Sequence, residues 1–290
     1  MLEDMGDLIH SVVKDLDFNW TLTSQHVEAV GRSESWRVQE LLAFFNQILV
    51  CQIDSADFVV PAITFIINSV VADYILTPFC ADIQDQSFQK GLTTLLDQIN
   101  CTGQSPTNAC GHSANQRAFT ESQEKAGRWR AMTFHALRAP NNDHISAIVE
   151  TGITWHLYHF FAALALSVDG ETHEKYQLHV SKNRVATLVE AALKLHDAAQ
   201  GEYVSVNYQA FLPQVGDPAL AEEVYVDVEA EQELSQAGQW RSTNISTPDA
   251  VVMIPTCMGL RASRKDSRGV VSEVVHKAKV VLMPGVTGTQ

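Results

Sequence analysis

Apolar residues recur at helical spacing in two consecutive stretches near the middle of the chain. The first begins after Asp143, whose side chain can accept a hydrogen bond from a free helix amide, and continues to Leu166 as a broad apolar belt. The second, from Tyr176 to Leu195, places charged and polar residues between the apolar ones. A helix that is apolar nearly all round lies inside a bundle, whereas one with a polar face covers it. The pattern therefore predicts a central helix and its antiparallel partner within residues 143–199.

Four shorter stretches with helical spacing predict further helices, at residues 8–16, 36–49, 88–99 and 118–139. The second of them follows Ser33-Glu34-Ser35, whose hydroxyl groups can accept hydrogen bonds from the free amides at a helix start. Glycine, serine, proline and asparagine gather between residues 100 and 115, which predicts a loop or a boundary there.

Residues 58–76 are apolar enough to suggest a membrane span, which requires about 20 predominantly apolar residues. Asn68, Ser69 and Asp73 interrupt the second half, and no cluster of lysine or arginine marks a cytoplasmic end. The stretch is therefore predicted to be a buried core helix, and no membrane partner is expected. It ends at Thr77-Pro78, because the residue before a proline is driven out of the helical conformation.

The character of the chain changes beyond Gly201. Residues 203–206 have strand-like side chains, and two further β-rich runs, 251–255 and 280–284, are similar enough to pair with each other. An isolated pair of strands is only marginally stable, so this pair is expected to lean on the helices. The expected fold is mainly α, with a helical bundle over residues 1–200 and a small mixed C-terminal portion, residues 201–290, packed on or beside it.

Charge is distributed unevenly along the 290 residues, whose formal net charge is −14. Residues 217–233 carry seven acids and no base, which is typical of a solvated helix or loop. Residues 261–279 carry six basic and two acidic residues, so this segment is +4 and the rest of the chain is −18. Such an acidic body excludes nucleic acid as a partner for the whole surface.

The basic segment 261–279 is expected to be a solvated loop that folds back on the acidic run, and the alternative is that it receives an acidic partner. Ser263 and Ser267 lie among its basic residues. Phosphorylation of both would remove most of the local positive charge, because each phosphate adds about −1.5 to −2. Such a modification would weaken the contact with the acidic run.

The chain has five cysteines, an odd number, and they are spread thinly along it, so they do not indicate a disulfide framework. It favours a reducing compartment. The acidic residues near Met1 are unlike the basic start of a secretory signal, so a cytoplasmic or nuclear location is expected.

Glu150, His156 and His159, in the first central stretch, are the candidate metal ligands. A carboxylate and two imidazoles inside a helical bundle can bind a metal ion. However, dimetal bundles use Glu-x-x-His on two helices, and residues 143–199 do not contain that motif. A buried histidine that forms a hydrogen bond with a neighbouring group is the simpler interpretation, so neither a metal nor a cofactor is expected.

Two other groups of residues have the right chemistry at the wrong spacing. The run Gly111-His112-Ser113-Ala114-Asn115 is similar to the G-x-S-x-G nucleophile elbow, but asparagine replaces the last glycine and no apolar strand leads into it. Cys101 and Cys110 are separated by eight residues, whereas the cysteine pairs of structural zinc sites are much closer. Glycine-rich phosphate loops are absent from the sequence. No catalytic residue and no cofactor-binding residue is therefore assigned.

Four short motifs follow one another in the order Leu76-Thr77-Pro78-Phe79, Trp129-Arg130-Ala131-Met132-Thr133, Leu212-Pro213-x-x-Gly216-Asp217-Pro218 and Val280-Val281-Leu282-Met283-Pro284-Gly285. This pattern resembles that of uncharacterised filamentous-fungal proteins, some of which are associated with regulatory or specialised-metabolism genes. The resemblance covers the chain from about Ile53 onward. It implies a fungal origin and a role accessory to a metabolic pathway, and it brings no catalytic residues with it.

The function favoured by the sequence is that of a non-enzymatic regulatory or protein-interaction protein with a protein partner, because core signals are strong and catalytic signatures are missing. The alternative is a small-molecule or metal-dependent enzyme with its site between the central helices. An aromatic belt on the first of these helices could line a ligand pocket, although aromatic residues at helical spacing mostly belong to the core. The belt consists of Trp155, Tyr158, Phe160 and Phe161.

Overall fold

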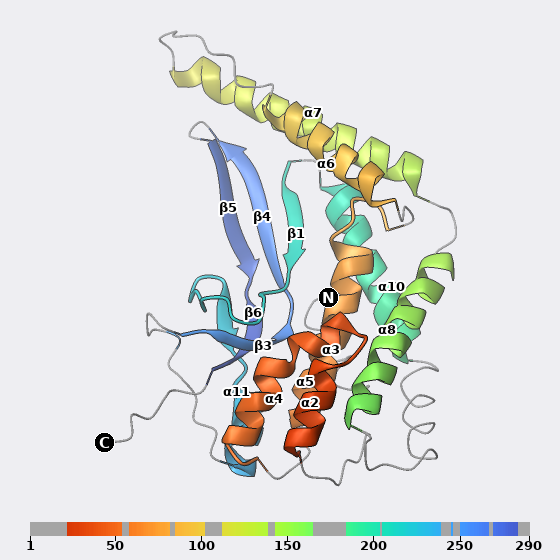
Figure 1. Cartoon of the computed structure of the whole chain (residues 1–290). Helices are drawn as coiled ribbons and strands as arrows, with labels where there is room; N and C mark the ends of the chain where they lie inside the picture. The colour runs from red at the N-terminus through yellow and green to blue at the C-terminus, as the bar shows by residue number, and fades with distance from the viewer. Residues whose placement is uncertain are drawn as a thin grey trace.

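Helices make up most of the described chain, and most of the strands lie in its last third (Figure 1). The computed structural model describes residues 22–53, 58–81, 85–101, 112–138, 143–164, 184–203, 205–238, 245, 250–266 and 269–283. A mainly α class with a few short C-terminal strands is therefore confirmed. The helices are α2 (Ser24–Gly31), α3 (Trp36–Glu40), α4 (Leu42–Val50), α5 (Val59–Val71), α6 (Gln86–Cys101), α7 (His112–Leu137), α8 (Asp143–Leu164), α10 (Arg184–Asp197) and α11 (Val228–Ala237), with π-helical turns η2 (Ala72–Leu76) and η3 (Ala198–Glu202).

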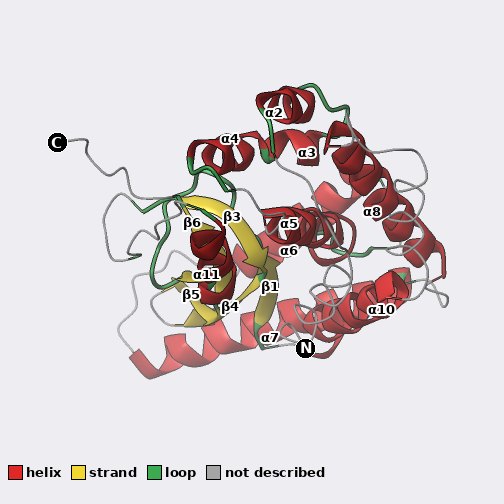
Figure 2. Cartoon of the chain, turned by 90° about the horizontal axis from the view of Figure 1, so that it is seen from below, coloured by secondary structure: helices red, strands yellow, loops and turns green. Residues whose placement is uncertain are grey.

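Helix α5 lies in the middle of the molecule, with strands on one side of it and α8 on the other (Figure 2). Twelve of its thirteen residues are buried, as predicted for a core helix. Pro61 falls in the first turn, where no amide hydrogen is needed. The last turn widens into η2, in which the Thr77 amide donates to the Ala72 carbonyl at 2.8 Å, and the helix ends before Pro78. The window Val59–Leu76 is long and apolar enough to cross a membrane by composition alone, but 78% of it is buried inside the protein.

Helix α8 was predicted to be the central helix, and this prediction is wrong because α5 takes that place. One face of α8 is buried and packs against α5, but Trp155 and Tyr158 are 42% and 44% exposed. The apolar belt of α8 therefore combines a core face with an exposed aromatic face. Helix α10 packs against α8, in agreement with its prediction as the partner helix.

The remaining helices follow the predicted pattern with local differences. The helix predicted at residues 36–49 is divided at Leu41 into α3 and α4, and α2 was not predicted. Helices α6 and α7 agree with prediction but extend into residues 100–101 and 112–115, which were expected to belong to a loop. The helix predicted at residues 8–16 lies outside the described residues.

The described strands form two three-stranded sheets, in the orders β1-β4-β5 and β2-β6-β3. The predicted pairing of the two β-rich runs is confirmed, since β3 and β6 are antiparallel neighbours. Pro255 is tolerated in β3 because this strand lies at the edge of its sheet. The strand predicted at residues 203–206 begins only at Asn207. The strands are β1 (Asn207–Phe211), β2 (Val224–Val226), β3 (Val252–Cys257), β4 (Gly259–Asp266), β5 (Gly269–His276) and β6 (Ala278–Leu282).

The two charged segments are more ordered than predicted. The basic segment, expected to be a solvated loop, is built around a hairpin in which β4 and β5 are antiparallel. The expected contact with the acidic run is present: Arg261 and Glu223 lie 2.7 Å apart, the Lys277 ammonium donates to the Ala221 carbonyl, and β2 pairs with the start of β6. The acidic run itself contains β2 and the first part of α11. Its Asp227 caps α11, and its buried Glu231 accepts a hydrogen bond from the Leu282 amide at 3.0 Å.

Helices and strands share one hydrophobic cluster. Residues of α5 belong to the same cluster as Met253 and Ile254 of β3 and Val281 of β6. A buried polar bond also joins these elements, because the Asn68 side chain on α5 donates to the Thr256 carbonyl on β3 at 3.0 Å. The strands therefore cover one side of α5, while α8 and α3 pack against it elsewhere.

Candidate functional site

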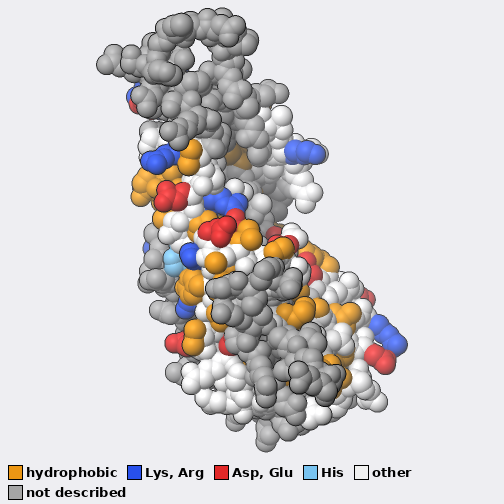
Figure 3. Space-filling model, turned by 90° about the vertical axis from the view of Figure 1, so that its left-hand side faces the viewer, with side chains coloured by type: hydrophobic (Ala, Val, Ile, Leu, Met, Phe, Trp, Pro, Cys, Tyr) orange, Lys and Arg blue, Asp and Glu red, His pale blue; other side chains and the backbone are white. Residues whose placement is uncertain are grey.

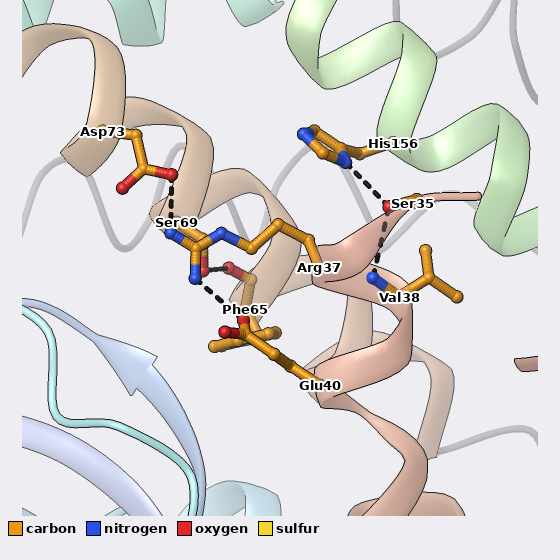
Figure 4. A network of polar contacts seen from close by, with 8 residues as sticks. All are labelled: Ser35, Arg37, Val38, Glu40, Phe65, Ser69, Asp73 and His156. Carbon is orange, nitrogen blue, oxygen red and sulfur yellow. Dashed lines mark hydrogen bonds and ion pairs between the residues drawn. The ribbon is translucent and has the colours of Figure 1, made fainter. Parts of the chain in front are cut away.

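Ser35 is a fully buried residue at the N-terminus of α3 and joins this helix to α8 (Figure 4). Its Oγ accepts a hydrogen bond from the Val38 amide at 3.2 Å and lies 2.7 Å from Nδ1 of His156. The amide can only donate, so the hydroxyl hydrogen is available for the imidazole nitrogen. Either Ser35 donates to Nδ1, or a protonated Nδ1 donates to the second lone pair of Oγ, depending on the tautomer of the neutral histidine.

The pKa of His156 is lowered to about 4, mainly because the ring is buried. The Arg37 guanidinium lowers it further, the Asp73 carboxylate opposes this effect, and His159 makes a smaller contribution in the same direction as Arg37. Arg37 is held by ion pairs to Asp73 at 2.5 Å and to Glu40 at 2.8 Å. Because these charges are paired with each other, the neutral imidazole lies beside them without a counter-ion of its own.

The hydrogen bond between Ser35 and His156 resembles that of a nucleophile and its base, but the surroundings do not support catalysis by this pair. Ser35 is 0% exposed, and its hydroxyl oxygen already caps α3. A base with a pKa near 4 is also a poor proton acceptor at neutral pH. The pair is therefore a structural bond between two helices.

An open groove of about 590 Å³ lies between α2 and α8. Three residues on one face of α8 line it, and a tryptophan lies one turn before them on the same face; we call these four residues, spaced i, i+3, i+4 and i+7, the α8 stripe. They are Trp155, Tyr158, His159 and Ala162. Within the stripe, the His159 ring packs edge-on against Trp155 at 4.5 Å and against Tyr158 at 5.3 Å, measured between ring centroids. These contacts hold the aromatic rings in a fixed arrangement along the groove.

The opposite wall of the groove is polar. Gln25, Glu28, Ala29 and Arg32 of α2 line it, together with Ser33 and Glu34 of the following turn. Glu28 and Arg32 form an exposed ion pair at 3.3 Å, which balances their charges. The carboxylate of Glu34 then gives this wall a net negative charge.

The structure does not bring the candidate metal ligands together. Within the residues that can be described, no group of three or more histidine, cysteine, aspartate or glutamate side chains has the geometry to hold a metal ion. His156 bonds to Ser35, and His159 belongs to the α8 stripe, while Glu150 joins neither of them in such a group. A Glu-x-x-His sequence occurs at Glu273 to His276, but it lies on strand β5, where residues three apart point to opposite faces.

The other predicted groups are placed as follows. The segment similar to a nucleophile elbow begins α7 from His112 onward, so Ser113 lies within a helix and not at a strand-to-helix turn. Cys110 lies outside the described residues. Phe160 and Phe161 of the aromatic belt are buried in the core, whereas Trp155 and Tyr158 are exposed, so the core interpretation holds for the first two residues and not for the other two.

Sequence analysis missed the groove because it missed α2. The helix is short, and its start lacks the usual capping signature, a serine or threonine followed three residues later by glutamate or glutamine. Thr23 is the capping residue, and its amide donates to the imidazole of His26, which replaces the glutamate of the common capping box. The buried residues His26, Val27 and Val30 were the available signal.

Fold and groove together define a mainly helical protein with two small sheets and an open, partly aromatic groove on its helical side. In comparisons with protein families, with curated proteins and with solved structures, nothing matches the chain.

Proposed function

We propose that the protein is a non-enzymatic regulatory or interaction protein whose groove between α2 and α8 binds a helical segment of a partner protein. The helices, acting as a bundle, are the scaffold that holds the groove. The observation that carries the proposal is the α8 stripe, in which Trp155 and Tyr158 are exposed on a helix whose opposite face is buried.

The stripe has the composition and spacing of a helix-binding surface. Tryptophan and tyrosine are enriched among the residues that dominate binding energies at interfaces. Covering their apolar area is favourable by about 25 cal/mol per Å². Side chains spaced i, i+3, i+4 and i+7 form a ridge along α8, and a second helix lying in the groove can pack against such a ridge.

Charge favours a basic amphipathic helix as the occupant. Apart from segment 261–279 the chain carries −18, and Glu34 adds a carboxylate to the wall of the groove. A partner helix with apolar residues toward Trp155 and Tyr158 and with lysine or arginine toward Glu34 is complementary in both respects. The resemblance to fungal proteins linked to specialised metabolism favours a partner from such a pathway, in the cytoplasm or nucleus.

Photo-crosslinking tests the location of the site. A photoreactive phenylalanine analogue is placed at Tyr158, and at Val50 in a control, because Val50 is exposed on α4 and does not line the groove. After irradiation in the native cells, the Tyr158 position is expected to give a crosslinked protein that the Val50 position does not give. The crosslinked segment of that protein, identified by mass spectrometry, is expected to be helical and basic.

Binding of that segment as a purified peptide then tests the energetics. The double variant Trp155→Ala, Tyr158→Ala is expected to bind about 100-fold more weakly, a loss of about 2.7 kcal/mol. Trp36→Ala is the matched control, since Trp36 is an exposed tryptophan outside the α8 stripe. Equal loss in both variants, or an acidic crosslinked segment, would show that the proposal is wrong.

A further inference from the structure

Strand β5 is an edge of its sheet, with β4 on one side and no described strand on the other (Figure 1). Val271, Ser272 and Glu273 are exposed one after another, and Val275 is 58% exposed. In Figure 3, which shows the side of the molecule where β5 lies, hydrophobic side chains stand among charged ones. Soluble proteins usually protect an edge with proline, lysine or a very short strand, because unpaired backbone groups accept another strand. The eight residues of β5 include no proline, no lysine and a single charged residue.

We propose that β5 pairs with β5 of a second copy of this chain, so that two three-stranded sheets join into one. The proposal is independent of the groove between α2 and α8. In a two-fold antiparallel pair the axis is normal to the sheet, and residues directly opposite each other point to the same face. Because neighbouring residues of a strand point to opposite faces, the axis must lie midway between one residue of β5 and the same residue of the second copy. This condition allows only a few registers, one for each residue of β5 that can lie opposite its own copy.

Sheet geometry and charge together select Ser272 as the residue that lies opposite its own copy. The regular pairing of β5 with β4 runs from Gly269 to Val274, where an irregularity follows, so its midpoint lies between Val271 and Ser272. When Ser272 lies opposite Ser272 of the second copy, Val270 lies opposite Val274 of that copy. An axis through Glu273 would place two carboxylates directly opposite each other, which is unfavourable.

Charge also fits the Ser272 register. In this register Val271 is opposite Glu273 of the second copy, and Val271 is paired on its other side with Arg264 of β4. Arg264 is exposed, and its long side chain can extend across the smaller valine toward that carboxylate. The two-fold axis repeats the interaction, so the interface contains two such pairs within a segment that is positive on an otherwise acidic protein.

A cysteine at position 272 tests the register directly. Residues opposite each other in antiparallel strands have Cα atoms about 4.5 or 5.5 Å apart, and a disulfide accepts about 4.4–6.8 Å. In a chain with Cys101→Ser and Cys110→Ser, the variant Ser272→Cys is expected to form a disulfide-linked dimer under mild oxidation. Val50→Cys in the same background is the control for random collision and is expected to crosslink at least about tenfold more slowly.

Sedimentation of the unmodified chain supplies a measurement that needs no variant. The wild type is expected to show a concentration-dependent equilibrium between monomer and dimer. Glu273→Arg is expected to weaken the dimer about tenfold, and the double variant Glu273→Arg, Arg264→Glu to restore it. Both positions are exposed, and circular dichroism checks that the fold is kept. A monomer at every concentration, a series of higher oligomers, or equal crosslinking at positions 272 and 50 would overturn the proposal.

Discussion

Lowering the pH from 8 to 5 is expected to destabilise the protein through His156. The pKa of this histidine is about 4 in the folded protein, and its ordinary value of 6.5 applies in the unfolded chain. Between these values the unfolded chain binds a proton that the folded protein does not bind. The contribution of His156 to the free energy of unfolding is therefore fully present above about pH 6.5 and decreases as the pH falls toward 4.

The size of the effect follows from the two pKa values. At pH 5 a histidine with the ordinary pKa is about 97% protonated, and one with a pKa of about 4 is about 9% protonated. The linkage relation then gives a loss of about 2 kcal/mol in the free energy of unfolding between pH 8 and pH 5. The side chain of His156 is buried, so solvent screening removes little of this difference. A loss of this size is a large fraction of an ordinary folding stability of about 5–15 kcal/mol.

Urea unfolding at pH 8, 7, 6 and 5 measures this loss in the wild type and in His156→Asn. The asparagine side chain can still accept a hydrogen bond from Ser35 or donate one to it, but it does not titrate. The variant is expected to be less stable at pH 8, because the ring packing is lost, and to lose about 2 kcal/mol less than the wild type on acidification. Since both chains share the other titrating groups, including His26, whose pKa is lowered by burial, the difference isolates His156. Equal losses in the two chains, or an NMR titration of His156 with a midpoint at 6 or above, would refute the reasoning.

Three substitutions test other parts of the structure by the same urea assay. Ser35→Ala removes both a helix cap and the bond to α8, with an expected loss of about 1–3 kcal/mol, whereas a loss below about 0.5 kcal/mol would contradict the role of that bond. Asn68→Ala leaves the Thr256 carbonyl without its donor and is also expected to lose about 1–3 kcal/mol, while an unchanged midpoint would mean that this bond contributes nothing. Gly259→Ala would place a methyl group 2.4 Å from the Phe211 ring, so a loss of about 1–3 kcal/mol is expected, and a neutral result would show that the ring moves freely.

Sequence patterns predicted those elements whose local signals agree with their final surroundings. The stretch that became α5 is apolar, begins with a proline in its first turn and ends before another, and nothing in its surroundings opposes a helix. The same holds for β3 and β6, which are rich in β-branched residues and in which Ile254 pairs with Val281. Ser35 was predicted as a cap because a serine before an apolar run is a local signal. Its second bond, to His156, lies 121 positions away along the chain and has no local signal.

The β4–β5 hairpin was not predicted, because the charged residues of the segment indicated a solvated loop although the valines of β5 favour a strand. In strand β4 the basic residues fall on both faces, so no amphipathic alternation marks the strand. The signal was in β5, where two pairs of valines flank Ser272 and Glu273. Charged side chains are compatible with a hairpin that keeps much of its surface in water, and therefore a charged segment is not necessarily a loop.

The face of α8 that was wrongly predicted to be buried is the face on which the proposed function depends. A helix apolar nearly all round was expected to lie at the centre, because exposing a second apolar face to water costs free energy. The structure places α5 at the centre, so α8 retains one face that the fold does not cover. Trp155 and Tyr158 make ring contacts with histidines of α8 but keep more than 40% of their surface in water. Their exposure is the observation on which the proposal of a partner helix rests.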